Sequence, residues 1–203
     1  MKKIAIITVL IAGFLGVIPV AANAQDAQKC NDSEAVLNNI MTRTSIRAYQ
    51  DKAVEKEKVD KILRAGMAAP SAVNKQPWAF VVVTNKELIA KISQVRRNDK
   101  SAVQPPLEIV VCGDKNKMLE GAAKDFWIQD CSAATENILL AAHALGLGAV
   151  WTGAYPIMER CKKISDALEL SDNLVPLCAI QIGYPAQNPA PKDKWKPENI
   201  IEK

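Results

Sequence analysis

Two short segments of the sequence place side chains that bind anions at alternate positions. These residues are Arg43, Ser45 and Arg47 in "TRTSIRAY", and Lys192 and Lys194 in "PKDKW". In extended chain, alternate side chains point the same way, so each segment would present two cations to one anion such as a phosphate. The hydroxyl of Thr44 adds a further hydrogen-bonding group. Each segment taken alone also suits a solvated surface, and spacing does not show whether the fold unites the two.

A third segment, "PSAVNKQPW", holds hydrogen-bonding side chains where a short turn would suffice. It joins a helical pattern to a strand-like run, and it places Ser71, Asn74 and Gln76 between Pro70 and Pro77. Two interpretations stay open. The polar groups would either cap the backbone of the turn itself or form a pre-organised rim for a planar polar ligand.

The sequence offers little catalytic machinery of its own. Its single histidine, His143, lies near the C-terminal end of an apolar helical stretch, where the partial negative charge of the helix favours a cation. One histidine cannot build a histidine metal cluster, and no G-x-S-x-G or Walker motif occurs. In "GLGAVWTG" the helix precedes the strand, the reverse of a dinucleotide-binding fingerprint. An enzyme of this kind would take its chemistry from a cofactor.

Helical patterns alternate with short apolar runs, which predicts one α+β or α/β domain. The helical patterns cover 33–43, 55–69, 85–95, 117–145 and 156–170, and the strand-like runs cover 78–84, 107–113, 148–153 and 175–183. Gly146 is the expected C-cap of the longest helix, and Pro156 the expected start of the last one. The second half of the longest helix, "CSAATENILLAAHAL", is apolar nearly all round, so we expect it to be packed on several sides.

The first residues read as a secretory signal peptide. Lys2 and Lys3 precede an apolar core, and Ala22-Asn23-Ala24 forms an A-x-A cleavage site. The rival interpretation is an uncleaved anchor helix. Cleavage of residues 1–24 would leave 25–203 as a single domain, exported to the bacterial periplasm.

Charge and cysteine usage narrow the possible partners. Loss of Lys2 and Lys3 lowers the formal net charge from +4 to +2, too weak an excess to indicate nucleic-acid binding. No second apolar run is long enough to cross a membrane, so we expect no membrane contact after the signal is cleaved. The cysteines, at 30, 112, 131, 161 and 178, are odd in number and lack a C-x-x-C motif, so we expect small buried hydrophobes.

Four blocks of the sequence, in this order, resemble the FMN-dependent nitroreductase family, in a compact exported form. They are "RTSIRAY", "AAPSAVNKQPWAFVVV", "QDCSAATENILLAAHALGLGAVWTG" and "PKDKWKPENI". The resemblance extends from Asn39 onward. It implies a nitroreductase-like α+β sandwich, a mixed sheet flanked by helices, that forms a homodimer with an FMN cleft at each side of the interface.

The resemblance also implies which residues bind the cofactor. Arg43, Thr44 and Ser45 would meet the phosphate and ribityl chain, with Lys192 and Lys194 on the phosphate. Arg47 would lie near the pyrimidine edge of the flavin. Since relatives often have an arginine in the tail, two lysines here give point charges without bidentate geometry.

Further cofactor positions follow from the same resemblance. A loop that reaches the flavin bound mainly by the other subunit would include Pro70, Ser71, Ala72 and Asn74. A strand end beside the central ring would include Trp151, Thr152 and Gly153, with a backbone N–H donating to N5. Asn98 would hydrogen-bond the ring or, alternatively, occupy a surface turn, and Gln129 and Asp130 would hold structure.

The activity implied is ping-pong hydride transfer from NAD(P)H, or from another donor, to nitroaromatic, quinone or flavin acceptors. Export favours another donor, because little NAD(P)H is expected outside the cytoplasm. One alternative is a non-enzymatic exported flavin-binding or electron-relay protein. A second is an exported α/β interaction domain whose phosphate site has decayed, which the retained arginines and lysines argue against.

Overall fold

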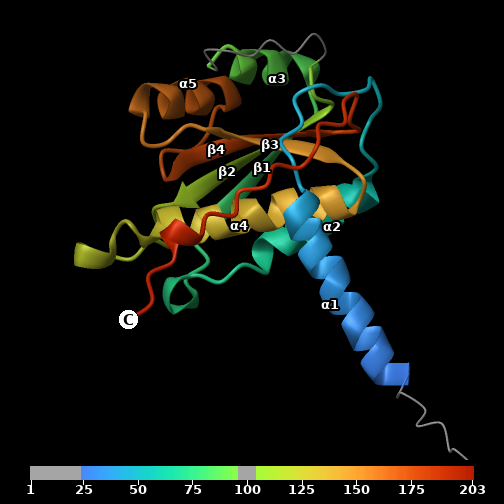
Figure 1. Ribbon diagram of the computed structural model, residues 1–203. Coiled ribbons are helices and arrows are strands. Elements are labelled where there is room, and N and C mark those ends of the chain that lie inside the picture. The colour runs from blue at the N-terminus through green and yellow to red at the C-terminus, as the bar shows by residue number, and fades with distance from the viewer. Residues whose placement is uncertain (1–23, 96–103) are drawn as a thin grey trace, which may run out of the picture. The chain divides into compact units, whose positions relative to one another are not determined.

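The computed structural model describes residues 24–95 and 104–203 (Figure 1). The chain divides into two units after Ala35, and helix α1 (Ala24–Thr42) crosses this division. The compact unit Val36–Lys203 carries the features discussed below. The expected signal core and Asn98 lie outside the described residues, so both remain predictions.

A four-stranded antiparallel sheet forms the centre of the compact unit. Its strands are β1 (Trp78–Val83), β2 (Leu107–Asp114), β3 (Gly148–Gly153) and β4 (Leu174–Gly183), in the order β1-β2-β4-β3. All three pairings are antiparallel, so these strands form an antiparallel sheet where a mixed one was expected, and an isolated parallel bridge joins Ser45 to Ala149. The predicted α+β class is confirmed.

Helices cover both faces of the sheet. In Figure 1, α2 (Lys56–Met67) and α4 (Phe126–Ala144) lie on one face, and α3 (Lys86–Ser93) and α5 (Met158–Leu168) on the other. Strand β2 serves both layers, because its successive side chains alternate between the faces. Ile109 and Val111 join the cluster around α4, whereas Val110 and Cys112 join the cluster around α3 and α5.

Helix α4 is the central helix that its composition predicts. It buries eight residues, including Asp130 and Thr135, and has no polar face of ordinary width. Helix α2 approaches it closely at Gly66, where an added Cβ would lie 2.9 Å from Cγ1 of Ile138. The Asn137 side chain donates from Nδ2 to the Ala65 carbonyl at 3.0 Å. The α4 backbone is therefore held in place from several sides.

Three helix starts differ from the prediction by more than one residue. The helix expected from Ser33 begins at Ala24. The helix expected from Lys117 begins only at Phe126, because Glu120 is extended and Gly121 has a φ of +61° that no α-helix accommodates. The helix expected from Pro156 begins at Met158, because a hydrogen bond from the Ile157 N–H to the Ala154 carbonyl places Pro156 in a turn.

Other local predictions are confirmed or refined. Gly146 terminates α4 with a φ of +73°, and the bonds Leu147 N–H to Ala142 O (2.9 Å) and Gly146 N–H to His143 O (3.0 Å) form a Schellman motif. Strand β1 lies at a sheet edge and leaves Val82 41% exposed.

The cysteines whose side chains are described act as small hydrophobes, as predicted. Cys112, Cys131, Cys161 and Cys178 are free and buried. Burial raises the pKa of Cys112 and of Cys178 to about 12, so both thiols stay protonated at neutral pH.

Candidate functional site

A pocket of about 750 Å³ brings the two cationic segments together. The residues predicted to bind the cofactor that line this pocket are Arg43, Thr44, Ser45, Arg47, Lys192 and Lys194. Ile40, Met41 and Trp195 form apolar parts of the wall. The fold thus answers the question that spacing left open, because residues almost 150 positions apart face one cavity.

Strand β3 fixes the first cationic segment. The Ile46 N–H donates to the Ala149 carbonyl at 3.0 Å, and Ser45 forms the parallel bridge to the same residue. Ile46 is buried with 6% exposure, so its neighbours Ser45 and Arg47 project to the other side, as extended chain requires. The segment lies so close to β3 that a Cβ on Gly148 would sit 2.6 Å from Cβ of Ile46.

The tail is tied to the same segment by a backbone clip, formed by residues 48–50 and 184–186. The Ala186 N–H donates to the Ala48 carbonyl at 2.9 Å, and the Gln50 N–H donates to the Tyr184 carbonyl at 2.9 Å. The Gln50 side chain also donates from Nε2 to the Pro185 carbonyl at 2.9 Å. Arg47 immediately precedes the clip and Gln187 immediately follows it, so both pocket walls depart from one fixed point.

The Tyr184 side chain anchors this clip to α2. Its hydroxyl donates to the Glu55 carboxylate at 2.8 Å and accepts from Lys58 Nζ at 2.9 Å, while Lys52 Nζ lies 3.7 Å from the ring centroid. The pKa of Glu55 is lowered by a bond from its own backbone N–H and then by Tyr184. The pKa of Lys58 is raised chiefly by its bond to Tyr184.

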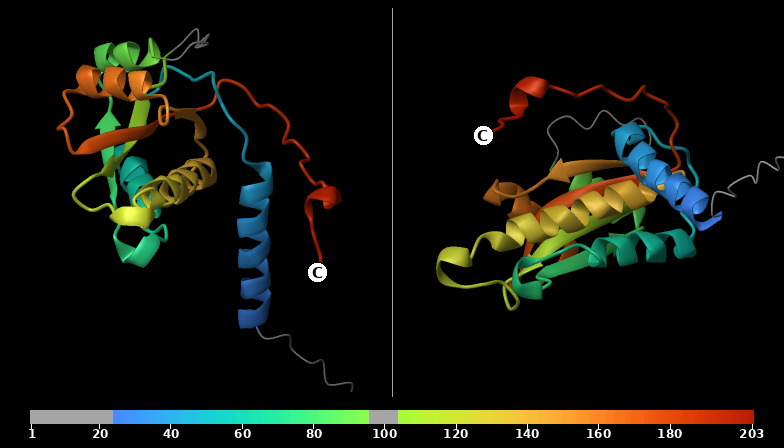
Figure 2. Two further views of the ribbon diagram at one scale, coloured as in Figure 1. Left: turned by 90° about the vertical axis from the view of Figure 1, so that its left-hand side faces the viewer. Right: turned by 60° about the horizontal axis from the view of Figure 1, so that its bottom comes forward.

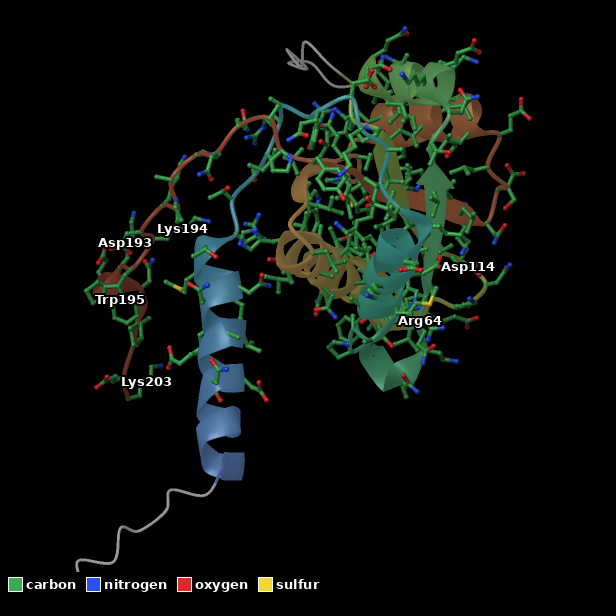
Figure 3. All side chains as sticks on the ribbon, turned by 90° about the vertical axis from the view of Figure 1, so that its right-hand side faces the viewer. Arg64, Asp114, Asp193, Lys194, Trp195 and Lys203 are labelled. Carbon is green, nitrogen blue, oxygen red and sulfur yellow. The ribbon has the colours of Figure 1, made fainter. Side chains whose placement is uncertain are left out.

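Beyond the clip, the tail is exposed and runs as extended chain to a short 3₁₀ turn, Pro197–Asn199 (Figure 2). Figure 3 shows Lys194 and Trp195 on the tail, well separated from Arg64 of α2 and from Asp114 at the end of β2. The tail cations Lys192 and Lys194 line the pocket together with α1 residues 40–41 and the 43–47 segment.

Positive charge dominates the pocket. Arg43, Arg47, Lys192 and Lys194 line it together with one carboxylate, Glu136 of α4. The Glu136 Oε1 atom lies 3.5 Å from Nε of Arg43. Such a surplus of cations suits an anionic ligand.

His143 lies next to this charge, and its protonation differs from the expectation. Its Nε2 hydrogen-bonds Thr42 Oγ1 at 2.9 Å, while that hydroxyl donates to the Asn38 carbonyl at 2.6 Å. Burial, and then the charge of Arg43, lowers the pKa of His143 below its ordinary value of 6.5. These two effects outweigh the helix end that the sequence suggested would favour the cation.

The loop 70–76 does not line the pocket. Its backbone is unusual, with φ of +52° at Val73, +54° at Asn74 and +49° at Gln76. Ser71 Oγ accepts from the Gln76 N–H at 2.9 Å, and Asn74 Oδ1 accepts from Gln76 Nε2 at 3.0 Å. Ser71 thus caps the backbone of the loop, whereas Asn74 and Gln76 bond each other through their side chains and remain exposed.

Helix α4 holds this loop in place. The buried Asp130 accepts from the Ala72 N–H at 2.8 Å, which is the structural role expected of it. Pro70 and Ala72 flank Ser71 in this anchored part of the loop. Asn74 borders a second pocket of about 500 Å³, whose other lining residues include Trp78, Phe80 and Lys117.

The predicted strand end is separate from the pocket lining. Trp151 packs against the core around α4, and Thr152 is half-buried beside it. Gly153 is exposed, and an added Cβ there would meet no atom within 4 Å. Arg160 donates from Nη1 to the Gly153 carbonyl at 3.3 Å.

Sequence reasoning missed several pocket residues. Glu136 sits in a helical run that is apolar nearly all round, and Gln187 falls in a tail without periodicity, so neither carried a signal. Trp195 does follow Lys194 directly in "PKDKW", which was the one available signal. Among residues 24–95 and 104–203, no group of His, Cys, Asp and Glu is arranged to hold a metal ion. Within the same ranges no helix has the length and hydropathy to span a membrane.

Comparison with known proteins gives this site a context. The family model described as the nitroreductase family matches residues 40–184. A protein of Methanothermobacter thermautotrophicus, predicted to be an NADH dehydrogenase/NAD(P)H nitroreductase, is 46% identical over 166 residues, covering 81% of this chain and 85% of the relative. The FMN reductase [NAD(P)H] of Bacillus subtilis is 29% identical over 180 residues, covering 81% of this chain and 72% of the relative.

A solved structure agrees with these relatives. The crystal structure of a predicted nitroreductase from Desulfovibrio desulfuricans, in complex with FMN, is 36% identical and aligns with a TM-score of 0.72. The alignment covers 83% of this chain and 96% of that chain. From the family model and the 46% identical relative together, the chain belongs to the nitroreductase family.

Proposed function

We propose that this protein is an FMN-dependent oxidoreductase that passes electrons from NAD(P)H to nitroaromatic, quinone or flavin acceptors. The observation that carries the proposal is the meeting of the 43–47 segment and the tail lysines at one pocket of about 750 Å³. The relatives named above support it, since one is an FMN reductase and another was solved with FMN.

The residues of the pocket fit the phosphate and ribityl parts of FMN. Arg43 offers a planar guanidinium that matches two phosphate oxygens, and Lys192 and Lys194 add positive charge. The hydroxyls of Thr44 and Ser45 suit a polyol chain. The volume lies within the range of about 300–1,000 Å³ that is usual for cofactor pockets.

Gly153 and Arg47 fit the ring of the flavin. Because a Cβ at Gly153 would meet nothing, the space beside this strand end is free for a ligand to approach the backbone. Bound FMN would supply the hydride-accepting centre. Arg47 would place positive charge near the pyrimidine edge, where it stabilises the negative charge that accumulates on reduction. No side-chain acid or base is needed, so donor and acceptor would use the same site in turn.

The proposal includes a homodimer. The loop 70–76 is exposed but lies outside the pocket of its own chain, so Pro70, Ser71, Ala72 and Asn74 would act at the site of a second copy. Ile40 and Met41 beside the pocket are 49% and 68% exposed, which a second copy would cover. Light scattering of the flavin-loaded protein tests this, and a flavin-loaded monomer would contradict it.

The first experiment is a visible spectrum of the purified protein, followed by anaerobic addition of NADH and NADPH. We expect bound flavin that loses its absorbance with either nucleotide and recovers it with a nitroaromatic. Flavin that resists both nucleotides would favour the alternative, an exported electron-relay protein with another donor. The signal-like residues 1–24 motivate that alternative, because NAD(P)H is scarce in the periplasm. A protein that takes up no FMN would contradict both.

A second experiment tests the phosphate assignment. Replacing Arg43 and Lys192 together by alanine removes two charged hydrogen-bonding partners, each contributing about 1.5–3 kcal/mol, so the FMN Kd should rise at least about a hundredfold. The matched control replaces Lys162 and Lys163 of α5, which form exposed ion pairs with Asp166 and Glu159. Equal flavin occupancy in the two double variants would overturn the assignment.

A further inference from the structure

We propose that Glu136 is a positioning residue, which orients the Arg43 guanidinium so that its terminal amino groups face the phosphate of the cofactor. The inference rests on the proposed function and deepens it. Glu136 is the acidic residue of the pocket lining, and its Oε1 atom lies 3.5 Å from Nε of Arg43.

The backbone that carries Glu136 is fixed by its neighbours. The buried Thr135 donates from Oγ1 to the Cys131 carbonyl at 2.8 Å, and Asn137 donates to the Ala65 carbonyl of α2 at 3.0 Å. Glu136 therefore projects from a rigid position on α4. Arg43 directly follows the end of α1, and its guanidinium is paired with Glu136.

The atom used in the ion pair determines what Arg43 offers to a ligand. A guanidinium carries five N–H donors, of which one is on Nε and four are on the terminal nitrogens. Because the carboxylate engages Nε, the edge formed by the two terminal nitrogens stays free for two phosphate oxygens. A carboxylate bound to that edge instead would block the phosphate.

The other neighbour of Arg43 leaves this ion pair undisturbed. His143 hydrogen-bonds Thr42, and its neutral form adds no charge that would repel Arg43 or attract Glu136. The Glu136 side chain is 48% exposed, so water screens its repulsion of a bound phosphate. Four cations line the same pocket and outweigh it.

The test compares FMN with riboflavin, which lacks the phosphate, in titrations followed by flavin fluorescence. Glu136→Ala should raise the FMN Kd about five- to tenfold and leave riboflavin binding within about twofold. Glu136→Gln should weaken FMN binding to a similar extent, because the 3.5 Å contact is an ion pair and the neutral amide lacks the charge that attracts the guanidinium. The matched control is Glu159→Ala, which breaks an exposed ion pair with Lys163 on α5.

A double-mutant cycle keeps the inference falsifiable whatever the single variant does to stability. Lysine has no Nε–H to orient, so in an Arg43→Lys background Glu136→Ala should change the FMN Kd by less than about twofold. Tighter FMN binding by both Glu136 variants, equal losses for FMN and riboflavin, or no effect of Glu136→Ala would overturn the inference. Each of these leaves the proposed function standing if the wild type binds FMN; a wild type that binds no flavin would overturn both.

Discussion

The two ends of strand β3 carry the same residue type for opposite reasons. A Cβ at Gly148 would lie 2.6 Å from Ile46, so the packing of the 43–47 segment onto β3 requires glycine there. A Cβ at Gly153 would meet nothing within 4 Å, and the fold gives no reason for glycine. The comparison separates a glycine that the packing of the fold requires from a glycine that only the proposed approach of the flavin to the backbone would explain.

The same contrast separates the core from the pocket. Strand β2 is buried along nearly its whole length, and the thiols near it are shielded from water. The pocket cations Arg47, Lys192 and Lys194 are exposed. Burial of apolar side chains thus explains the residues of the core, whereas the exposed pocket cations have no role in that burial. Four experiments test this division.

The largest expected effect is on the reactivity of the thiols buried around strand β2. The thiolate is the reactive form of cysteine, and a rise in the pKa of Cys112 from 9.0 to about 12 lowers its thiolate fraction at pH 8 by roughly a thousandfold. In a Cys30→Ser/Cys161→Ser variant, which keeps only buried thiols with strongly raised pKa values, the folded protein should therefore react roughly a thousandfold more slowly with Ellman's reagent than the protein in guanidinium. Rapid reaction of the folded variant would show that this region is open.

Substitution at the packed end of β3 should destabilise the protein. Gly148→Ala forces Ile46 away from β3, and overpacking of this kind costs about 1–3 kcal/mol. The Tm in thermal unfolding should fall by about 2–8 °C. FMN affinity should fall with it, because Ser45 and Arg47 flank Ile46. An unchanged Tm would mean that the segment shifts freely, and the distinction between the two glycines would be lost.

Substitution at the open end should affect the ligand alone. Gly153→Ala meets no protein atom, so its Tm should stay within about 1 °C of the wild type. If the flavin approaches the backbone there, the added methyl group should raise the FMN Kd about fivefold and alter the bound flavin spectrum. Unchanged affinity together with unchanged Tm would leave Gly153 without a function.

The smallest effect is expected at His143, beside the pocket. Since its pKa in the folded protein lies below 6.5, the unfolded chain binds more protons in this range, and stability falls as the pH drops through and below 6.5. His143→Gln should therefore lose less Tm than the wild type between pH 7.5 and pH 5. The partly exposed ring is screened by water, so the difference should be on the order of 1 °C. A larger loss in the variant would contradict the sign.

The sequence predicts the elements of this fold well where one pattern dominates. The four strands are short apolar runs bounded by turn residues, and all four occur where expected. The predicted helix start at Lys117 was wrong because the residues before Phe126 fit a helical period, which the extended Glu120 and the left-handed Gly121 interrupt. Positive φ at Val73, a β-branched residue, is equally invisible in a pattern, since tertiary contacts such as that of Asp130 impose it.

The candidate site likewise contains residues that the sequence singled out and residues that only the structure reveals. Residue type and alternate spacing singled out its cations as candidates, and the fold brings them to one pocket, which spacing could not show. Glu136 was not singled out, because its importance depends on how close α4 comes to Arg43. The clip between Tyr184 and Gln50 was likewise hidden, since backbone hydrogen bonds leave no mark on residue identity.

The clip also has a consequence for the order of folding. Lys192 lies 149 positions after Arg43, and residues 184–186 pair with 48–50 across most of the chain. Contacts between such distant residues form slowly, because the entropy of loop closure is lost before they contribute. A chain emerging from the ribosome would lack the tail side of the pocket until residues 184–195 had followed. Cofactor uptake then marks the end of folding, and flavin fluorescence would report the moment at which it is complete.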